Sequence, residues 1–363
     1  MTERPGIGHR LDSLRDELVH AEIDALLVSD VLNVRWLTGF TGSLAYAYVS
    51  GTEAWIGVDS RYTVQASGEC PGWRVERLAS SSAENLAELL KGQGIRRLGA
   101  EADQLTYAAF CSMRDRLDGA VELVPTNGII GRLRMIKDDA ELNAIRAACR
   151  AVDTVATHLM GFLRPGISER DVMIELESTL RSGLGLEIAF PSIVVSGPRT
   201  ALPHGQPTDR LLQPGDFVTM DYGAKKDGYC SDITRTIVLG AADSEQTRVH
   251  SVVLEAQRRA IAGIRNGVAA SAVDALAREH IAANGYGDYF GHGLGHSLGL
   301  HVHDGGGMAP SSNLTLQTGM VLTVEPGIYV PGWGGVRIED DIVVTADGCE
   351  ALTSANRELV EII

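Results

Sequence analysis

Residues 291–304, GHGLGHSLGLHVHD, carry four of the chain's ten histidines, at positions 292, 296, 301 and 303. His292 and His296 are spaced so that they would share one helix face, but the glycines at 291, 293, 295 and 299 disfavour a helix here. We therefore expect a strand or loop whose backbone packs closely against its neighbours.

Two other interpretations of this stretch are weaker. Gly293 and Gly295 match the first glycines of a dinucleotide-binding fingerprint, but Leu298 stands where the third is needed and no strand-turn-helix pattern follows. A single histidine in such a segment is usually a hydrogen-bonded core residue. Four histidines together require partners, which makes the positions of acidic residues decisive.

The composition is that of a globular protein. The chain has 363 residues, 44% of them hydrophobic and 22% charged, which suits two domains with a sizeable core. A formal net charge of -15 argues against a nucleic-acid partner or an acidic membrane surface, because both require a basic face.

Cysteine usage and the chain's start predict the compartment. The five cysteines are scattered and odd in number, so neither a disulfide framework nor a zinc-thiolate site is indicated. The first residues are charged without an apolar leader core, and no apolar run approaches the ~18 residues needed to span a bilayer. We expect a cytoplasmic protein.

Strands alternate with helices in the first third of the chain. Helical spacing of leucines marks residues 9–21, apolar runs predict strands at 24–28, 45–50, 53–58 and 97–101, and helices are expected from Asp59, at 83–91 and at 107–117. This alternation predicts an α/β domain over residues 1–130. Turn residues cluster at 124–137, which makes that segment the expected boundary before a second domain over residues 131–363.

Helices and strands are grouped differently in the second domain. Asp138 or Asp139 can cap a long helix to about residue 162, and Ser168 with Asp171 resembles a capping box for a second helix. Further helices are expected at 245–265 and 270–283, and β-rich runs at 217–223 and 229–239.

Both β-rich runs carry an aspartate. If residues 225–228 form a four-residue hairpin loop, Asp221 lies directly opposite Asp232 on one face. Two carboxylates facing each other are unfavourable unless a cation lies between them. The alternative is a solvated pair of carboxylates at a sheet edge.

Two glutamates also lie within apolar strand-like runs. They are Glu325 in VLTVEPGIYV and Glu339 in GGVRIEDDIVV. Charged residues in such runs are seldom fully buried without a partner. Arg337 could neutralise one of them as a structural ion pair, but it cannot neutralise four acids.

The four acids balance two divalent ions, with His296 as a neutral nitrogen ligand. Oxygen ligands with one imidazole suit Mn²⁺ or Co²⁺ better than a structural zinc site does. Two such ions ~3.5–4 Å apart with a bridging water form a hydrolytic centre.

Four segments together resemble the pita-bread metallopeptidases, which include Xaa-Pro aminopeptidases and Xaa-Pro dipeptidases. In chain order they are MDYGAKKDGYCSDITRT, GHGLGHSLGLHVHD, VLTVEPGIYV and GGVRIEDD. NVRWLTGFTGS and DSRYTVQA are similar to the N-terminal domain of the Xaa-Pro subgroup. The resemblance implies an α+β protein, in which a creatinase/prolidase-type α/β domain precedes a catalytic domain with a curved, mainly antiparallel sheet.

The resemblance also implies roles for ten residues. The metal ligands would be Asp221, Asp232, His296, Glu325 and Glu339, with Asp232 and Glu339 bridging both ions and Glu325 also moving protons. On the substrate side, His303 would contact the scissile carbonyl or stabilise the oxyanion, and His204 would be a second catalytic histidine beside the substrate. His292 and Tyr329 would line the pocket, and Arg337 would orient the ligand strand.

The implied function is release of an N-terminal residue from peptides with proline at position two. A water or hydroxide bridging two divalent ions, Mn²⁺ by expectation with Co²⁺ or Zn²⁺ as alternatives, would attack the peptide bond. The resemblance also implies a homodimer.

In the dipeptidases of the family that this chain resembles, an arginine between the HVH[DE] and EPG motifs holds the dipeptide's carboxylate. Residues 305–324 contain no lysine or arginine, and together with the FTGS segment this favours an Xaa-Pro aminopeptidase. A dipeptidase (prolidase) is the alternative. A non-catalytic binding protein of the same fold is disfavoured because all five ligands are present.

Overall fold

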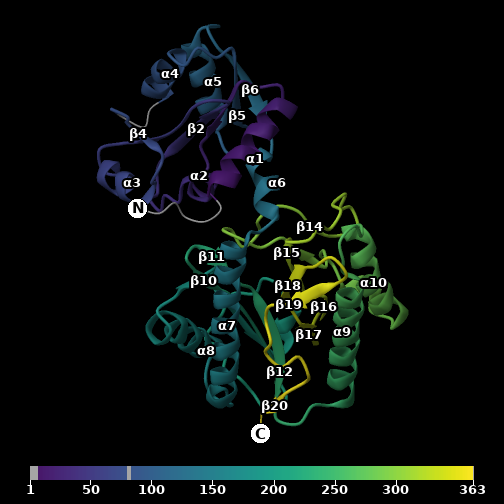
Figure 1. Ribbon diagram of the computed structural model, residues 1–363. Helices are drawn as coiled ribbons and strands as arrows, with labels where there is room; N and C mark the ends of the chain where they lie inside the picture. Colours follow the sequence, from purple (N-terminus) through teal and green to yellow (C-terminus); the bar gives the residue numbers. More distant parts are fainter. Residues whose placement is uncertain (1–6, 80–82, 363) are drawn as a thin grey trace. The chain divides into compact units, whose positions relative to one another are not determined.

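The computed structural model describes residues 7–79 and 83–362, and divides into two compact units, Met1–Arg134 and Met135–Ile363 (Figure 1). Residues 1–6, on which the expectation about the chain's start partly rests, lie outside the described residues. No helix among the described residues is both long and apolar enough to cross a membrane.

The first unit is a six-stranded mixed sheet in the order β4-β3-β2-β1-β5-β6. Its strands are β1 (Ala25–Val28), β2 (Tyr46–Ser50), β3 (Ala54–Val58), β4 (Arg74–Arg77), β5 (Arg97–Glu101) and β6 (Glu122–Thr126). Its helices are α1 (Ile7–His20), α2 (Val31–Thr38), α3 (Thr63–Glu69), α4 (Ala83–Lys91), α5 (Tyr107–Leu117) and α6 (Ile129–Met135). The predicted α/β organisation is confirmed.

Two details of the first unit differ from the sequence prediction. The Asp59 side chain accepts the backbone N–H of Arg61 in a turn, and the helix begins only at Thr63. Part of the turn-rich segment forms β6, in which Pro125 pairs with Ala100 in parallel. Proline is tolerated there because β6 is an edge strand.

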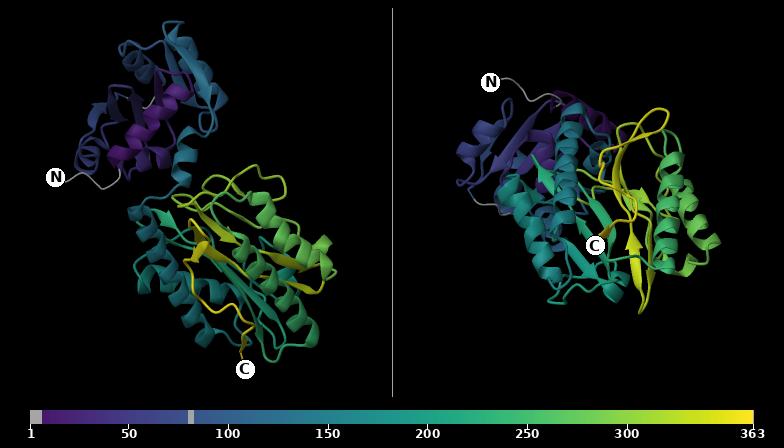
Figure 2. Two further views of the ribbon diagram at one scale, coloured as in Figure 1. Left: turned by 45° about the vertical axis from the view of Figure 1, so that its right-hand side comes forward. Right: turned by 90° about the horizontal axis from the view of Figure 1, so that it is seen from below.

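The second unit packs two helix pairs against mainly antiparallel strands. The helices are α7 (Asp139–Phe162), α8 (Glu169–Ser178), α9 (Ser244–Gly263) and α10 (Ala270–Ala283), with short helical turns η1 (Thr179–Gly183), η2 (Gly197–Ala201) and η3 (Gly287–Tyr289). One apolar core lies with α7 and α8, and another with α9 and α10. The yellow C-terminal segment runs between α7 and α9 (Figures 1 and 2).

The strands of the second unit form several small sheets, of which the four-stranded sheet β20-β12-β9-β8 is the largest. They are β7 (Glu187–Ile188), β8 (Ile193–Ser196), β9 (Phe217–Tyr222), β10 (Ala224–Lys226), β11 (Tyr229–Cys230), β12 (Ile233–Leu239), β13 (Gly295–His296), β14 (Gly307–Met308), β15 (Val321–Val324), β16 (Gly327–Val330), β17 (Gly334–Arg337), β18 (Asp340–Val344), β19 (Cys349–Ala351) and β20 (Glu361–Ile362). The α+β class is therefore confirmed.

Helix starts follow the predicted capping chemistry. Asp138 accepts the backbone N–H of Glu141, whose carboxylate accepts the Asp138 N–H in return. Ser168 and Asp171 form the same reciprocal box at α8. These side chains satisfy backbone donors that the first turn would otherwise leave free.

The predicted register of the aspartate hairpin is wrong by two residues. Asp227 and Gly228 alone form the turn, with φ of 51° and 92°, and Lys226 pairs with Tyr229. An Asp-Gly pair readily adopts the left-handed backbone that a two-residue hairpin turn requires. Asp221 therefore pairs with Thr234 instead of facing Asp232. Because side chains alternate with period two, the shift keeps both aspartates on one face.

Candidate active site

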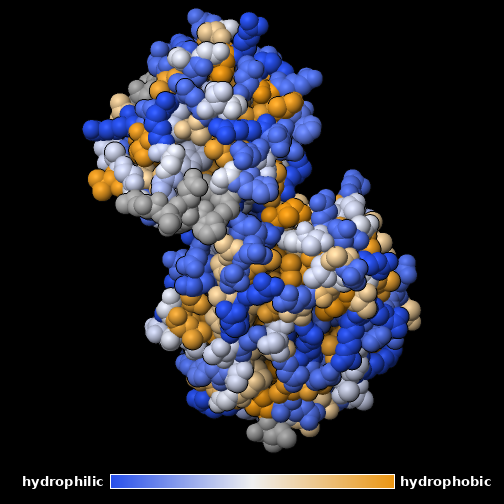
Figure 3. Space-filling model, viewed as in Figure 1, coloured by the Kyte–Doolittle hydropathy of each residue, from blue (hydrophilic) through white to orange (hydrophobic). Residues whose placement is uncertain are grey.

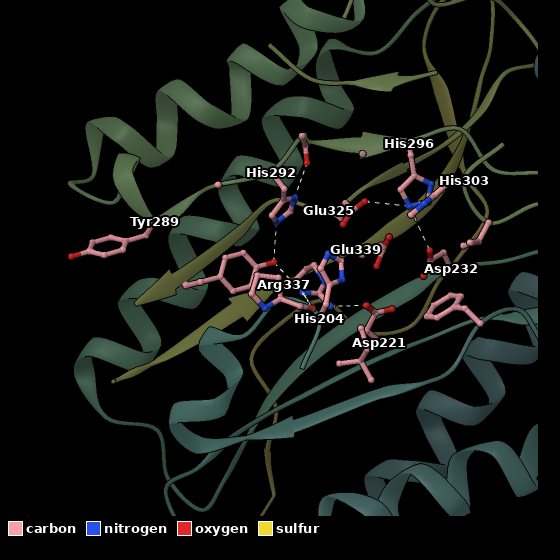
Figure 4. A pocket seen from close by; sticks show the side chains of 18 of the residues that line it. His204, Asp221, Asp232, Tyr289, His292, His296, His303, Glu325, Arg337 and Glu339 are labelled. Atoms are coloured by element: carbon pink, nitrogen blue, oxygen red, sulfur yellow. Dashed lines mark hydrogen bonds and ion pairs between the residues drawn. The ribbon is translucent and has the colours of Figure 1, made fainter. Parts of the chain in front are cut away.

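All ten residues singled out from the sequence line one cavity of about 770 Å³ in the second unit. They come from separate strands and loops, and Figure 4 labels nine of them: His204, Asp221, Asp232, His292, His296, His303, Glu325, Arg337 and Glu339. Tyr329 is the tenth. Phe190 and Ile193 add apolar wall, and Asp288 with Tyr289 add an exposed rim that the sequence did not indicate. Residues as far apart in sequence as Phe190 and Glu339 thus meet in one place.

Three predicted ligands form the tightest group. One ligand atom from each of Asp232, His296 and Glu339 lies within 4.8 Å of the other two. The His296 Nε2 atom is 3.7 Å from Asp232 Oδ2 and 3.4 Å from Glu325 Oε1. Asp221 lines the same cavity but lies outside that group.

Close backbone packing holds His296 in place. Gly295 and His296 form β13, and a side chain at Gly295 would overlap the carbonyl oxygen of Thr323. The backbone N–H of His296 donates to Thr323 Oγ1 at 3.0 Å. The expectation of a strand or loop with close backbone packing is confirmed, with only Gly295 and His296 in a strand.

The tautomer of His296 suits a ligand. Its Nδ1 lies 3.3 Å from the Ser297 carbonyl oxygen, which can only accept, so Nδ1 carries the proton. Burial lowers the pKa of His296 to about 4. The ring is therefore neutral, with the Nε2 lone pair directed at the carboxylates, as in most metal-binding histidines.

Threonine hydroxyls orient two of the glutamates. Thr323 Oγ1 donates to Glu325 Oε1 at 3.1 Å, and Thr234 Oγ1 donates to Glu339 Oε2 at 2.6 Å. The sequence analysis missed both threonines. The available signal was spacing, since Thr323 stands two residues before Glu325, and Thr234 two residues after Asp232, on the same strand face.

Arg337 neutralises only one acid of the cluster. Its Nη2 donates to Asp221 Oδ2 at 2.6 Å, and its Nε donates to Thr234 Oγ1 at 3.0 Å. The side chain is 4% exposed. The remaining three carboxylates have no lysine or arginine among the described residues that line the cavity.

The uncompensated carboxylates repel one another. Burial raises the pKa of Asp232 and of Glu339 well above the usual range, and neighbouring carboxylates raise both further. Burial also raises the pKa of Glu325 to about 7, against a lowering by Arg337. Such shifts mean that the protein alone does not stabilise the ionised cluster.

A hydrogen-bonded chain fixes the aromatic side of the cavity. Arg337 Nη1 donates to the Tyr329 oxygen at 3.0 Å, and His292 Nε2 lies 2.9 Å from the same oxygen. His292 Nδ1 lies 2.8 Å from the Gly293 carbonyl and therefore donates to it. Tyr329 must then donate to His292 Nε2. Burial lowers the pKa of His292 to about 4, so this ring is neutral.

His303 and His204 both face the cavity from exposed positions. The His303 ring packs edge-on against His296 with centroids 4.2 Å apart. Partial burial lowers the pKa of His303, and His301 lowers it further. No hydrogen bond to either ring occurs among the described residues, so both are available to a substrate.

The sequence analysis also passed over Asp341, which is fully buried. Its Oδ2 accepts the backbone N–H of Asp232 at 2.9 Å and the thiol of Cys149 at 3.3 Å. The run EDD at 339–341 inside an apolar segment was the signal for such a role. Asp341 thus fixes the backbone of a predicted ligand.

The donor set fits divalent cations. Within the described chain, Asp221 Oδ1 and Asp232 Oδ1 are buried oxygens that accept no hydrogen bond. Buried polar atoms normally have partners, so these orphaned oxygens mark where a cation would bind. Four carboxylates and one imidazole are the hard, oxygen-rich set that Mn²⁺ and similar ions take.

The described residues that line the cavity offer no free lysine or arginine for a peptide's carboxylate. Residues 305–324 contain no lysine or arginine, and Gly307 pairs with His296 in β14. Among the cavity residues that the structure describes, Arg337 is the sole lysine or arginine, and Asp221 already holds it.

Comparison with known families covers both units. Residues 143–346 match metallopeptidase family M24, and residues 10–136 match the creatinase/prolidase N-terminal domain. The first match covers the predicted ligands and substrate-side residues described above.

Individual relatives align over nearly the whole chain. An uncharacterized peptidase of Bacillus subtilis, YqhT, is 42% identical over 97% of this chain and 99% of its own. The structure of an Xaa-Pro dipeptidase from Bacillus anthracis has a TM-score of 0.95 at 40% identity, covering 98% and 100%. An X-Pro aminopeptidase from Thermotoga maritima has a TM-score of 0.86 at 34% identity, covering 94% and 98%.

Proposed function

Because this chain belongs to metallopeptidase family M24 and carries a creatinase/prolidase N-terminal domain, we propose that it hydrolyses the bond before proline in Xaa-Pro dipeptides. The observation that carries a metal-dependent reaction is the group formed by Asp232, His296 and Glu339 beside Glu325. The similarity to an Xaa-Pro dipeptidase over the full chain supports the substrate.

Asp221, Asp232, His296, Glu325 and Glu339 would hold two divalent ions. The ions would polarise the scissile carbonyl and lower the pKa of the attacking water. We propose Mn²⁺ as the ion. Elemental analysis of the purified protein checks both its identity and the number of ions per chain.

Glu325 would carry the proton through the reaction. Burial raises the pKa of Glu325 to about 7, which supports a role as proton acceptor and donor. It would take a proton from the attacking water, whose oxygen adds to the carbonyl carbon. It would return that proton to the proline nitrogen as the C–N bond breaks.

Substrate-side residues would divide the remaining work. His303 and His204, whose rings make no hydrogen bond among the described residues, would donate to the oxyanion. His292 uses both ring nitrogens within the protein, so it would position Tyr329 and Arg337 rather than donate to the substrate. Arg337 would in turn hold Asp221.

Proline after the scissile bond explains why a dedicated peptidase is needed. The tertiary amide has no N–H, and the locked φ misfits the extended backbone that general peptidases bind. A cavity of about 770 Å³ with a metal-binding floor is large enough for a dipeptide or tripeptide.

An Xaa-Pro aminopeptidase, the activity expected from the sequence, is the second candidate. The comparisons favour the dipeptidase, since the higher TM-score and identity belong to the protein of that name. The absence of a free arginine or lysine among the described cavity residues favours longer peptides. In the dipeptidase, histidine or backbone N–H donors would hold the proline carboxylate.

Initial rates on Ala-Pro and Ala-Pro-Ala, measured side by side with chelated and metal-restored enzyme, separate the candidates. Metal-dependent preference for Ala-Pro supports the dipeptidase, and preference for the tripeptide supports the aminopeptidase. Cleavage of neither peptide contradicts both. Light scattering of the same preparation tests the predicted homodimer, and cell fractionation tests the predicted cytoplasmic location.

A further inference from the structure

A second cavity, of about 190 Å³, lies behind the sheet in the same unit. Its walls come from α7, β12, α9 and the C-terminal segment 355–360. Ala156, Met160, Ile237 and Val360 supply apolar wall, and Arg357 and His250 supply polar groups. Its volume is slightly above the ~150 Å³ of an apolar cavity that accommodates benzene.

The charged groups around this cavity are not balanced. Asp340, fully buried, accepts hydrogen bonds from Arg235 Nη2 at 2.8 Å and from Arg357 Nε at 2.6 Å. Glu358, which lines the cavity, pairs with Arg258 outside it. One carboxylate between two guanidinium groups leaves one positive charge in excess.

Arg357 is the cation with donors to spare. Arg235 directs its remaining N–H groups at the carbonyls of Thr234, Glu339, Ala355 and Asn356. Arg357 bonds only through Nε, so both of its Nη groups make no hydrogen bond within the described chain. Its side chain is about one-third exposed, at 32%. A guanidinium in this state binds carboxylates well.

His250 provides a second, independent sign of a ligand. The residue is 3% exposed, lines the cavity, and its ring makes no hydrogen bond with any described residue. Its ring nitrogens are not among the fully buried unpartnered atoms of the described chain, so they are open to the cavity and can bond to a molecule there. Burial lowers its pKa to about 4, so the ring is a neutral donor and acceptor.

We propose that this cavity is a binding site for a small organic monocarboxylate, whose carboxylate bonds to the Arg357 Nη groups and whose apolar body lies against Ala156, Met160 and Ile237, within reach of His250. One excess positive charge matches one carboxylate, whereas a phosphate would need more cations than the lining supplies. The apolar walls favour a hydrocarbon body over a sugar or a peptide backbone. This inference does not rest on the proposed function.

Calorimetric titration of the metal-loaded enzyme with benzoate tests the site, and benzamide is the neutral match in size. We expect one benzoate per chain, bound at least about tenfold more tightly than benzamide, because a charge-assisted hydrogen bond contributes more than a neutral one. No binding of benzoate, or equal binding of the two compounds, overturns the proposal.

Two variants locate the bound benzoate. Arg357→Gln removes the free guanidinium, and we expect benzoate affinity to fall at least about tenfold. Ala156→Leu adds three carbons to the apolar lining, and we expect binding to be lost with the charges unchanged. Arg259→Gln, which changes an exposed arginine whose partner Glu255 also lies outside the lining, is the matched control and should bind normally.

Circular dichroism melting of each variant ensures that folded protein is titrated. Benzoate binding that survives both Arg357→Gln and Ala156→Leu would place the compound elsewhere, for example at the active-site metals, and would overturn the proposal.

Discussion

The segment from Asp232 through β12 borders both cavities. On one side, Asp232 lines the active-site cavity and Thr234 donates to Glu339 there. On the other side, Arg235 and Ile237 line the smaller cavity. We call these the site side and the back side. Both bury carboxylates almost completely. They differ in how the protein balances the charge.

The site side gathers four carboxylates around one arginine: Asp221, Asp232, Glu325 and Glu339 around Arg337. The back side gathers two arginines around one carboxylate, Asp340, which accepts four hydrogen bonds. Buried acids therefore do not in themselves mark a metal site. A metal site is marked by buried acids that lack lysine or arginine partners, because their negative charge is left for bound metal ions to balance.

The largest expected effect comes from removing a ligand on the site side. Asp232→Asn should weaken binding of both ions and lower kcat at least about a thousandfold, since several kcal/mol of metal-ion stabilisation are lost. Elemental analysis and initial rates measure the two effects. Asp227→Asn, at the exposed turn of the same hairpin, is the control and should change neither. Full metal occupancy in Asp232→Asn would rule out its bridging role.

An aspartate-to-asparagine substitution on the back side should lower folding stability. Asp340→Asn leaves Arg235, only 6% exposed, without its carboxylate, and we expect a loss of about 3–5 kcal/mol in the free energy of unfolding. Urea denaturation measures it. Glu350→Gln, which breaks an exposed pair with Arg146, should cost about 1 kcal/mol or less. Equal losses in the two variants would contradict the charge balance assigned to the back side.

A substrate-side variant separates chemistry from metal binding. His303→Ala should keep the metal content and lower kcat by about a hundredfold, as loss of one transition-state donor does. Mass-spectrometric metal content and steady-state kinetics give the two readouts. His158→Ala, on α7 and paired with Glu175, should leave kcat unchanged. An unchanged kcat in His303→Ala would remove it from the reaction.

The smallest expected effect is a pH dependence on the back side. Burial first, and then Arg235, lowers the pKa of His250 to about 4 from the ordinary 6.5. The unfolded chain therefore binds the proton more readily, and stability falls as pH drops through the window between these values. From pH 7.5 to 5.5 the loss attributable to His250 should be about 1 kcal/mol. The stability of His250→Leu should fall less over this pH range than that of the wild type. An identical fall in both proteins would exclude His250 as its cause.

Local chemistry was predictable from the sequence where side chains act on their own backbone. Asp138 and Ser168 cap their helices as expected, because a cap involves only residues within one turn. The predicted hairpin register was wrong because it assumed a four-residue turn, whereas Asp227 and Gly228 form a two-residue turn. The resulting shift of two residues left Asp221 and Asp232 on the same face.

The side-chain pairs formed between strands that are distant in sequence were not predictable from local sequence. That Arg337 would pair with Asp221 rather than a glutamate depends on how β9 and β17 meet. Asp340 and Asp341 stand beside Glu339 in sequence, yet one neutralises arginines on the back side and the other holds the Asp232 backbone. Sequence spacing assigns them to faces, but only packing supplies their partners.

The most direct test is the metal content of the wild-type protein, measured together with its activity on Ala-Pro before and after chelation. The account predicts about two divalent ions per chain, loss of activity on chelation, and recovery when Mn²⁺ is restored. A folded protein that contains less than one ion per chain and cleaves Ala-Pro equally well after chelation would contradict it.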